Sequence, residues 1–139
     1  MINHLTLVRG LRNGVSVTWE LAKAIVPVYL IVTFLKYTPV LPWIARAFTP
    51  LMRLAGLPGE ASLALVLGFV VNIYAAVGAI VSLSLTPKQI TVIATIILLA
   101  HSLPVETAVS KKSGIEVLPI LAIRLGLGFT CGVILNLLL

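Results

Sequence analysis

The sequence predicts an all-α integral membrane protein. Of its 139 residues, 60% are hydrophobic and 10% are charged, whereas about a quarter of the residues in a soluble domain carry charge. Several apolar stretches approach or exceed the roughly 20 residues that a spanning helix needs. Prolines and glycines interrupt these stretches. We therefore expect one domain over residues 1–139, with about four membrane segments, some broken, and with interfacial or re-entrant amphipathic helices.

The distribution of charge favours lipid over nucleic acid as a partner. The formal net charge is +6, but aromatic residues do not alternate with basic ones as they do in nucleic-acid-binding segments. Basic residues at the ends of apolar segments suit contact with lipid headgroups. The single cysteine, Cys131, lies inside an apolar run, so it has no disulfide partner within the chain. We expect no cofactor.

The first 15 residues predict an amphipathic helix lying on the membrane surface. Its apolar residues recur every three or four positions, at Ile2, Leu5, Val8, Leu11 and Val15. Arg9 and Arg12 lie off that stripe, as in helices that rest on lipid headgroups. A spanning helix should follow over Val17–Leu35 and end before Pro39.

Two segments of different character come next. Trp43–Leu57 is amphipathic but too basic to span, so we expect an interfacial helix or one limb of a re-entrant hairpin. Ala61–Leu85 has 25 residues without a charge and should form a membrane segment. Its middle, Gly68–Gly78, is rich in small residues and contains Asn72, which needs a hydrogen-bond partner there. Part of this segment is expected to be unwound.

A broken helix is predicted around Pro104. Thr86-Pro87-Lys88-Gln89 has the pattern of a capping box that starts a helix. The apolar run that follows, Ile90–Leu103, is too short to span before Pro104 removes a backbone donor. Around this proline lies Ala100-His-Ser-Leu-Pro-Val-Glu-Thr107. Ionisable residues beside a broken helix at membrane depth are costly, and they indicate a site for a solute or an ion.

The last segment, Val117–Leu139, is long enough to span. Arg124, Gly128, Gly132 and Asn136 are spaced by four and share one face. Gly128 and Gly132 predict close helix packing, and we expect a homo-oligomer, such as a dimer, to form through them. Arg124 should pair with a carboxylate inside the protein, with Glu106 as the expected partner.

Six residues are candidates for binding a solute or an ion. They are Asn72, Tyr74, His101, Ser102, Glu106 and Thr107. Together they offer both donors and acceptors, which suits hydroxyls and amides. His101 and Glu106 are weak candidates for metal ligands, because a transition-metal site needs several convergent ligands. Each also has a structural alternative: His101 could bond a carbonyl freed near Pro104, and Glu106 could simply pair with Arg124.

The stretch Ala100–Thr107, followed by Gly114 and Ile123-Arg124-Leu125, resembles the Gate domain, or nucleoside recognition, family of membrane proteins. This bacterial and archaeal family includes the spore maturation proteins. Its domain also occurs in ferrous-iron transporter B, and a related domain occurs in concentrative nucleoside transporters. The similarity runs from about Gly14 to the C-terminus.

The resemblance implies a compact helical unit that works as one half of a larger assembly. The iron transporter's Gly-Phe-Gly-Cys-Asn-Val-Pro-Ala motif has its nearest counterpart in Gly68–Ala75. Val71 stands at the cysteine position and Tyr74 at the proline position. The loss of the thiolate argues against iron as the substrate.

Three hypotheses for function follow. The first is a transport or solute-binding half-unit in the cell membrane that oligomerises, or pairs with a second Gate-type subunit, to form a polar site. That site would accept a nucleoside-like solute or a cation. The second is a structural or regulatory subunit without transport of its own. The third, an enzyme using His101, Ser102 and Glu106, ranks lowest, because these residues match no catalytic motif.

Orientation follows from the side on which each basic residue lies. If four segments span, one side carries Arg9, Arg12 and Lys88, and the other carries Lys36, Arg46, Arg53, Lys111 and Lys112. The excess of basic residues mildly predicts that the second side is cytoplasmic. Insertion in both orientations remains open.

Overall fold

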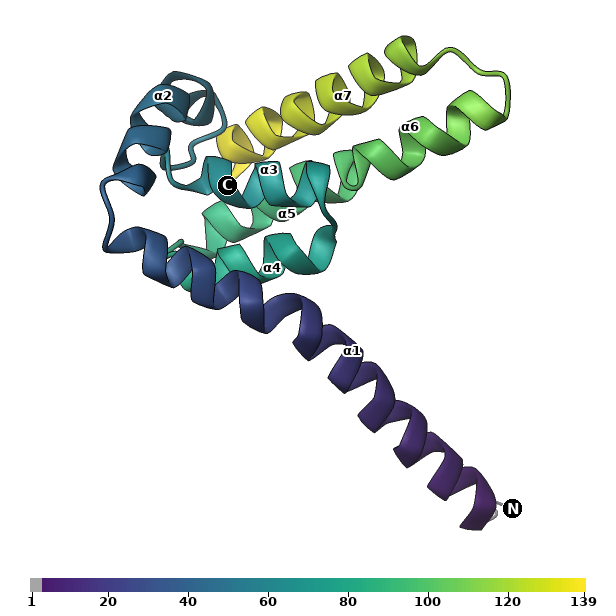
Figure 1. The fold of residues 1–139 in the computed structure, drawn as a ribbon. Coiled ribbons are helices and arrows are strands. Elements are labelled where there is room, and N and C mark those ends of the chain that lie inside the picture. Colours follow the sequence, from purple (N-terminus) through teal and green to yellow (C-terminus); the bar gives the residue numbers. More distant parts are fainter. Residues whose placement is uncertain (1–3) are drawn as a thin grey trace.

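A computed structural model describes residues 4–139, which form seven helices. They are α1 (His4–Lys36), α2 (Val40–Leu54), α3 (Ala61–Val70), α4 (Ile73–Ser82), α5 (Pro87–Ala100), α6 (Leu103–Lys112) and α7 (Val117–Leu138) (Figure 1). The predicted all-helical membrane fold is confirmed. Three stretches are long and apolar enough to cross a membrane, namely α1, the pair α5–α6, and α7.

Helix α1 runs without a break through the boundary expected near residue 16 and ends at Lys36, as the prolines after it predict. Its first part extends away from the body of the molecule, and residues 4–20 are exposed on every side (Figure 1). Its second part packs on α4, where a Cβ at Gly78 would lie 2.8 Å from the carbonyl oxygen of Ile25. Residues 1–3 of the predicted surface helix lie outside the described residues, and its position at the membrane surface stays a prediction.

The segment Ala61–Leu85, which we expected to be partly unwound, is interrupted at Val71–Asn72. It forms a hairpin in which α3 and α4 pack side by side, joined by a short turn at Val71–Asn72. Each helix has 10 residues, or about 15 Å, which is half of a hydrocarbon core of about 30 Å. The hairpin therefore returns to the side from which it starts (Figure 1).

The broken helix forms near Pro104, as expected. Thr86 and Gln89 make the predicted capping box, with bonds of 3.3 and 3.0 Å between backbone and side chains. Helix α5 ends at Ala100. After two intervening residues, α6 starts at Leu103 and continues in nearly the same direction (Figure 1). The break precedes Pro104 because proline is compatible with the first turn of a helix, where its missing N–H would have no partner.

Helix α7 is the main partner of α5, and their contact uses the two glycines. Gly128 and Gly132 are buried, and a Cβ at Gly132 would lie 2.7 Å from the Cδ1 and Cγ1 atoms of Ile96. Ile93, Ile96 and neighbouring residues of α3 and α4 form the apolar core. The glycine face of α7 is thus used inside the chain. An oligomer contact through Gly128 and Gly132 stays a prediction.

We predict that Gly132→Leu destabilises the single chain. The added side chain would overpack the contact with Ile96, at a cost of about 1–3 kcal/mol. The thermal unfolding midpoint in mild detergent measures this loss. Gly126→Leu is the matched control, because a Cβ at Gly126 meets nothing within 4 Å. Equal midpoints for the two variants would contradict the packing.

Candidate functional site

The turn of the α3–α4 hairpin lies beside the break between α5 and α6. The backbone N–H of Ser102 donates to the carbonyl of Gly68, at 2.9 Å, and so ties the two interruptions together. The 14 residues of α5 reach about 21 Å and the hairpin about 15 Å, and both lengths are shorter than a hydrocarbon core of about 30 Å. We therefore expect both interruptions to lie inside the membrane. We call this region the junction. It consists of the turn at Val71–Asn72, the break at His101–Ser102, the helix ends beside them, and Arg124 of α7.

Asn72 starts α4 at the tip of the hairpin. Its backbone is extended, and its Oδ1 accepts from the backbone N–H of Ala75 at 2.9 Å, which is an N-cap contact. The amide therefore has the hydrogen-bond partner that its place in an apolar segment required. Close packing at Gly68 brings the tip against α5, since a Cβ there would lie 3.1 Å from the Ile97 side chain.

Ser102 interrupts the helical backbone at the break between α5 and α6. Its φ of 51° and ψ of 40° lie in the left-handed region, and it is the only such non-glycine residue among those described. Its carbonyl accepts from the N–H groups of Val105 and Glu106, at 3.1 and 3.2 Å. Ser102 thus ends one helix and starts the next, in a conformation that disfavours most side chains.

Arg124 reaches the junction from α7. Its Nε donates to the carbonyl of Leu99 at 2.9 Å, and its guanidinium forms an ion pair with the carboxylate of Glu106. The two side chains are 22% and 40% exposed, respectively. One guanidinium therefore satisfies a carbonyl freed at the end of α5 and a carboxylate on α6, as the sequence led us to expect for Glu106.

His101 makes the contact expected of a histidine at a helix end. Its Nδ1 lies 3.2 Å from the carbonyl of Leu98. Because a carbonyl only accepts hydrogen bonds, Nδ1 is the donor in this contact, which leaves Nε2 for another partner. His101 is half-buried, so Nε2 is the chemically available atom of this side chain.

The other two candidates lie on either side of this centre. Thr107 is half-buried and lines a narrow crevice between α6 and α7 together with Glu106 and Arg124. Tyr74 lies in the first turn of α4 and is 45% exposed. All six candidates thus belong to the elements that meet at the junction.

The structure does not add a metal centre to this set. Within residues 4–139, no three His, Cys, Asp or Glu side chains gather closely enough to hold a metal ion. Cys131 is half-buried on α7. His101 and Glu106 accordingly lack a third ligand in the described part of the chain.

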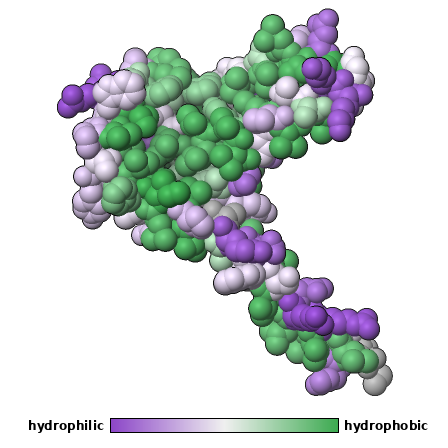
Figure 2. Space-filling view, in the orientation of Figure 1, coloured by the Kyte–Doolittle hydropathy of each residue, from purple (hydrophilic) through white to green (hydrophobic). Residues whose placement is uncertain are grey.

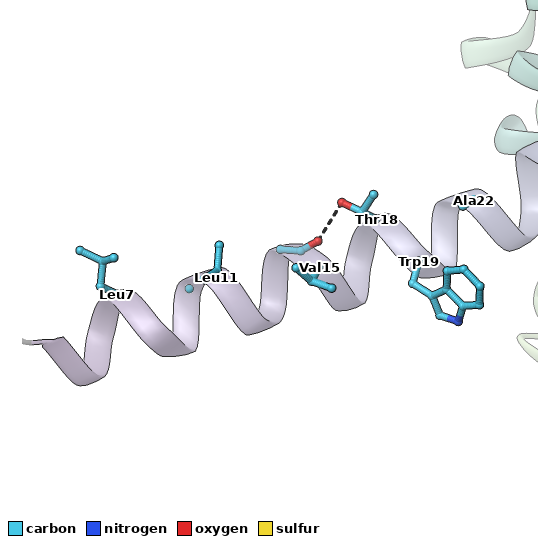
Figure 3. Close-up of a pocket in the computed structure, with 8 residues that line it drawn as sticks. Leu7, Leu11, Val15, Thr18, Trp19 and Ala22 are labelled. Atoms are coloured by element: carbon cyan, nitrogen blue, oxygen red, sulfur yellow. Dashed lines mark hydrogen bonds between the residues drawn. The ribbon is translucent and has the colours of Figure 1, made fainter.

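Another hollow lies elsewhere, on the protruding part of α1. It is an open groove of about 720 Å³, lined by Leu7, Gly10, Leu11, Gly14, Val15, Thr18, Trp19 and Ala22. All of these residues come from one helix, and the Thr18 hydroxyl donates to the Gly14 carbonyl at 2.9 Å (Figure 3). The groove lacks converging polar groups, so the junction remains the better candidate for recognition of a polar solute.

The junction also depends on backbone groups, which were not among the candidates from the sequence. The carbonyls of Gly68, Leu98 and Leu99 each bond a group at the break. Only Gly68 had a visible sequence pattern, because small residues surround it. The sequence does not indicate the role of the leucine carbonyls, since any residue at those positions has a backbone carbonyl.

We predict that Glu106 and Arg124 are energetically coupled. Glu106→Gln or Arg124→Gln leaves one charge without its partner, and each should lower stability by about 1–3 kcal/mol. The double variant should lose less than the sum of the two. Thermal or denaturant unfolding of the four proteins measures the coupling, and strictly additive losses would refute it.

A second prediction concerns the backbone of Ser102. Ser102→Gly should preserve or slightly raise the unfolding midpoint, whereas Ser102→Val should cost about 1–3 kcal/mol, because β-branched residues disfavour positive φ. Ser113 has a φ of −83° and serves as the matched control for the same two changes. The proposed geometry is wrong if Ser102→Val is no less stable than Ser113→Val.

Comparison with known proteins agrees with this architecture. The chain is 43% identical over 128 residues to a protein of Bacillus subtilis (strain 168) named as the uncharacterized membrane protein YvoD. The match covers 92% of this chain but 41% of the relative, so the chain spans about two fifths of that protein's length. No solved structure matches the chain.

The family comparison covers the body of the fold. The family model described as Gate, nucleoside recognition, matches residues 18–127. The matched region runs from α1 into α7 and includes both the hairpin and the broken helix. The chain therefore belongs to the Gate family of membrane proteins, a family associated with nucleoside recognition and transport.

Proposed function

We propose that the chain is a half-unit of a multi-pass transport or solute-binding protein in the cell membrane, and that its junction binds a small, nucleoside-like solute. The observation that carries this proposal is the meeting of two helix interruptions at mid-membrane depth, tied by the bond from Ser102 to Gly68. Non-helical backbone persists at that depth only where protein covers it or where it lines a polar cavity. Substrate sites in transporters are built from such interrupted helices.

The junction offers unused donors and acceptors to a solute. Among the described residues, the N–H groups of Ile73 and Tyr74 at the start of α4 have no hydrogen-bond acceptor. His101 Nε2 is an acceptor, and the Tyr74 hydroxyl can act either way. Nucleosides present hydroxyls, ring nitrogens and exocyclic groups, which pair with such a mixed set.

A cation is the less favoured substrate. His101 and Glu106 have no third ligand among residues 4–139, and Glu106 is already paired with Arg124. Val71 and Tyr74 supply no soft ligand at the tip of the hairpin. A metal site would need two such pairs from two chains, converging on one point.

Catalysis is not part of the proposal. In the described part of the chain, the His101 ring contacts the Leu98 carbonyl through Nδ1, and this contact does not activate the Ser102 hydroxyl. The residues that would form a catalytic group are instead used to hold the break between α5 and α6.

A structural or regulatory role is the second candidate. It is favoured by the bonds that the polar groups already make: Glu106 with Arg124, Arg124 with the Leu99 carbonyl, and Asn72 with the Ala75 N–H. In that case, the chain would support another Gate-type protein without binding a solute itself.

Thermal-shift measurements on the purified protein separate these functions. We expect nucleosides to raise the unfolding midpoint, and His101→Ala and Tyr74→Phe to reduce this shift, because each removes a polar group that the proposal assigns to solute binding. Fe²⁺, Zn²⁺ and Mn²⁺ form the comparison series. Uptake of labelled nucleoside into proteoliposomes then distinguishes transport from binding alone.

Thr91→Ala is the matched control for these variants. It removes an exposed hydroxyl that bonds the Pro87 carbonyl within α5, far from the break. A metal-dependent shift that disappears in His101→Ala, with no response to nucleosides, would show that the substrate is a cation. No shift with either series would favour the structural role.

A further inference from the structure

Glu60 is an acid that takes no part in the junction. The sequence has four acids, and two of them form ion pairs within the chain, Glu20 with Lys23 and Glu106 with Arg124. Among the residues that the structure describes, Glu60 makes no ion pair and no side-chain hydrogen bond. Its carboxylate is therefore available to a cation from outside the chain.

A cavity of about 330 Å³ lies beside Glu60. The start of α2, the start of α3 and the α4–α5 loop form its walls, and the residues that line it are Leu41, Pro42, Pro58, Glu60, Ser84 and Leu85. The polar side chains in this set are a carboxylate and a hydroxyl, and the other four are apolar. Because both polar groups accept hydrogen bonds, the cavity suits a small ligand with positive charge and N–H donors at one end.

The walls of the cavity are held together by contacts between distant parts of the chain. A Cβ at Gly59 would lie 2.7 Å from the Oγ1 atom of Thr49, so glycine lets α2 lie directly against the start of α3. Gln89 Nε2 of α5 donates to the carbonyl of Gly56 at 3.5 Å and ties the α2–α3 loop to the start of α5. The cavity is thus a product of the tertiary structure.

The cavity lies at one end of the spanning stretches. Helix α1 ends shortly before α2, and the stretch α5–α6 begins just after the α4–α5 loop, so two of the three apolar stretches have an end here (Figure 1). Tyr37 and Trp43 at this end are 87% and 74% exposed, as is typical of aromatic residues at a membrane–water interface. Figure 2 shows a largely hydrophobic body with hydrophilic residues toward its ends. The cavity therefore faces the headgroup region.

We propose that this cavity binds the headgroup of an aminophospholipid, phosphatidylethanolamine. Its primary ammonium pairs with the Glu60 carboxylate and donates hydrogen bonds to that carboxylate and to the Ser84 hydroxyl. The apolar walls contact the carbon atoms next to the ammonium. Arg46 of α2 and Lys88 of α5 belong to the same end of the molecule, where basic residues favour lipid phosphates.

Other ligands fit this cavity less well. A metal ion needs several convergent ligands, and no three His, Cys, Asp or Glu side chains gather within residues 4–139. An anionic headgroup without an amine would place negative charge beside Glu60. Phosphatidylcholine has the positive charge but no N–H donor on its nitrogen, so it loses the hydrogen bonds. The proposal does not depend on any solute at the junction.

Native mass spectrometry of the purified protein with competing lipids tests the proposal. We expect phosphatidylethanolamine to be retained about tenfold more than phosphatidylcholine, because it adds charge-assisted hydrogen bonds. Retention should fall stepwise through the mono- and dimethylated headgroups. Equal retention of the two lipids, or stronger retention of phosphatidylglycerol, would overturn the proposal. Displacement of the lipid by millimolar free ethanolamine would also overturn it, since the ligand would then be a soluble amine.

Two variants test the assignment of the ammonium to Glu60. Glu60→Gln should reduce retention of phosphatidylethanolamine to the level of phosphatidylcholine. Glu116→Gln is the matched control, because Glu116 is an exposed acid without an ion pair in the described part of the chain and lies at the start of α7, far from the cavity (Figure 1). Equal effects of the two changes would contradict the site.

Ser84→Lys keeps the proposal testable if Glu60→Gln fails to fold. It adds an ammonium to the wall of the cavity beside Glu60, so it should displace the lipid and raise the unfolding midpoint in lipid-free detergent. Undiminished retention of phosphatidylethanolamine in this variant would overturn the proposal. A nucleoside-dependent thermal shift should be the same in Ser84→Lys and in the unaltered protein, so the two proposals fail separately.

Discussion

The structure depends on how one arginine compensates a helix break inside an apolar protein. Where α5 ends at Ala100, the last carbonyls of the helix lose their intrahelical partners. Arg124 donates to one of them, at Leu99, and its charge is balanced by Glu106 at the start of α6. Without this side chain, a carbonyl and a carboxylate would both be unsatisfied at mid-membrane depth. The break is tolerated because Arg124 of α7 lies next to both the freed carbonyl and the carboxylate.

Close packing sets the position of the hairpin relative to that break. Small residues let three helix pairs approach each other: Gly78 toward α1, Gly68 toward α5, and Gly132 of α7 toward α5. In a membrane, where apolar surface alone provides little force between helices, such contacts supply the attraction. They hold the hairpin tip against the break, so that the Ser102 N–H can reach the Gly68 carbonyl.

Local features of the fold followed directly from the sequence. The capping box at Thr86, the break before Pro104 and the spanning length of α7 each depend on residues close together in the chain. The hairpin was not predicted, because an uncharged run of 25 residues suits one spanning helix as well as two short antiparallel ones. Asn72 marked the place of the turn, but a polar residue in an apolar run is equally common in an unbroken helix that makes a polar contact.

The sequence by itself determined that this is a helical membrane protein whose polar residues gather beside a broken helix. Hydropathy, proline positions and capping patterns act within a few turns, so they can be read from neighbouring residues. The tertiary structure decided which segments meet. The same glycines on α7 could serve a contact within or between chains, and only the packing of Ile96 against Gly132 shows that the contact is internal. The hairpin was likewise decided by the tertiary structure, because the direction of the chain after Asn72 depends on packing between α3 and α4.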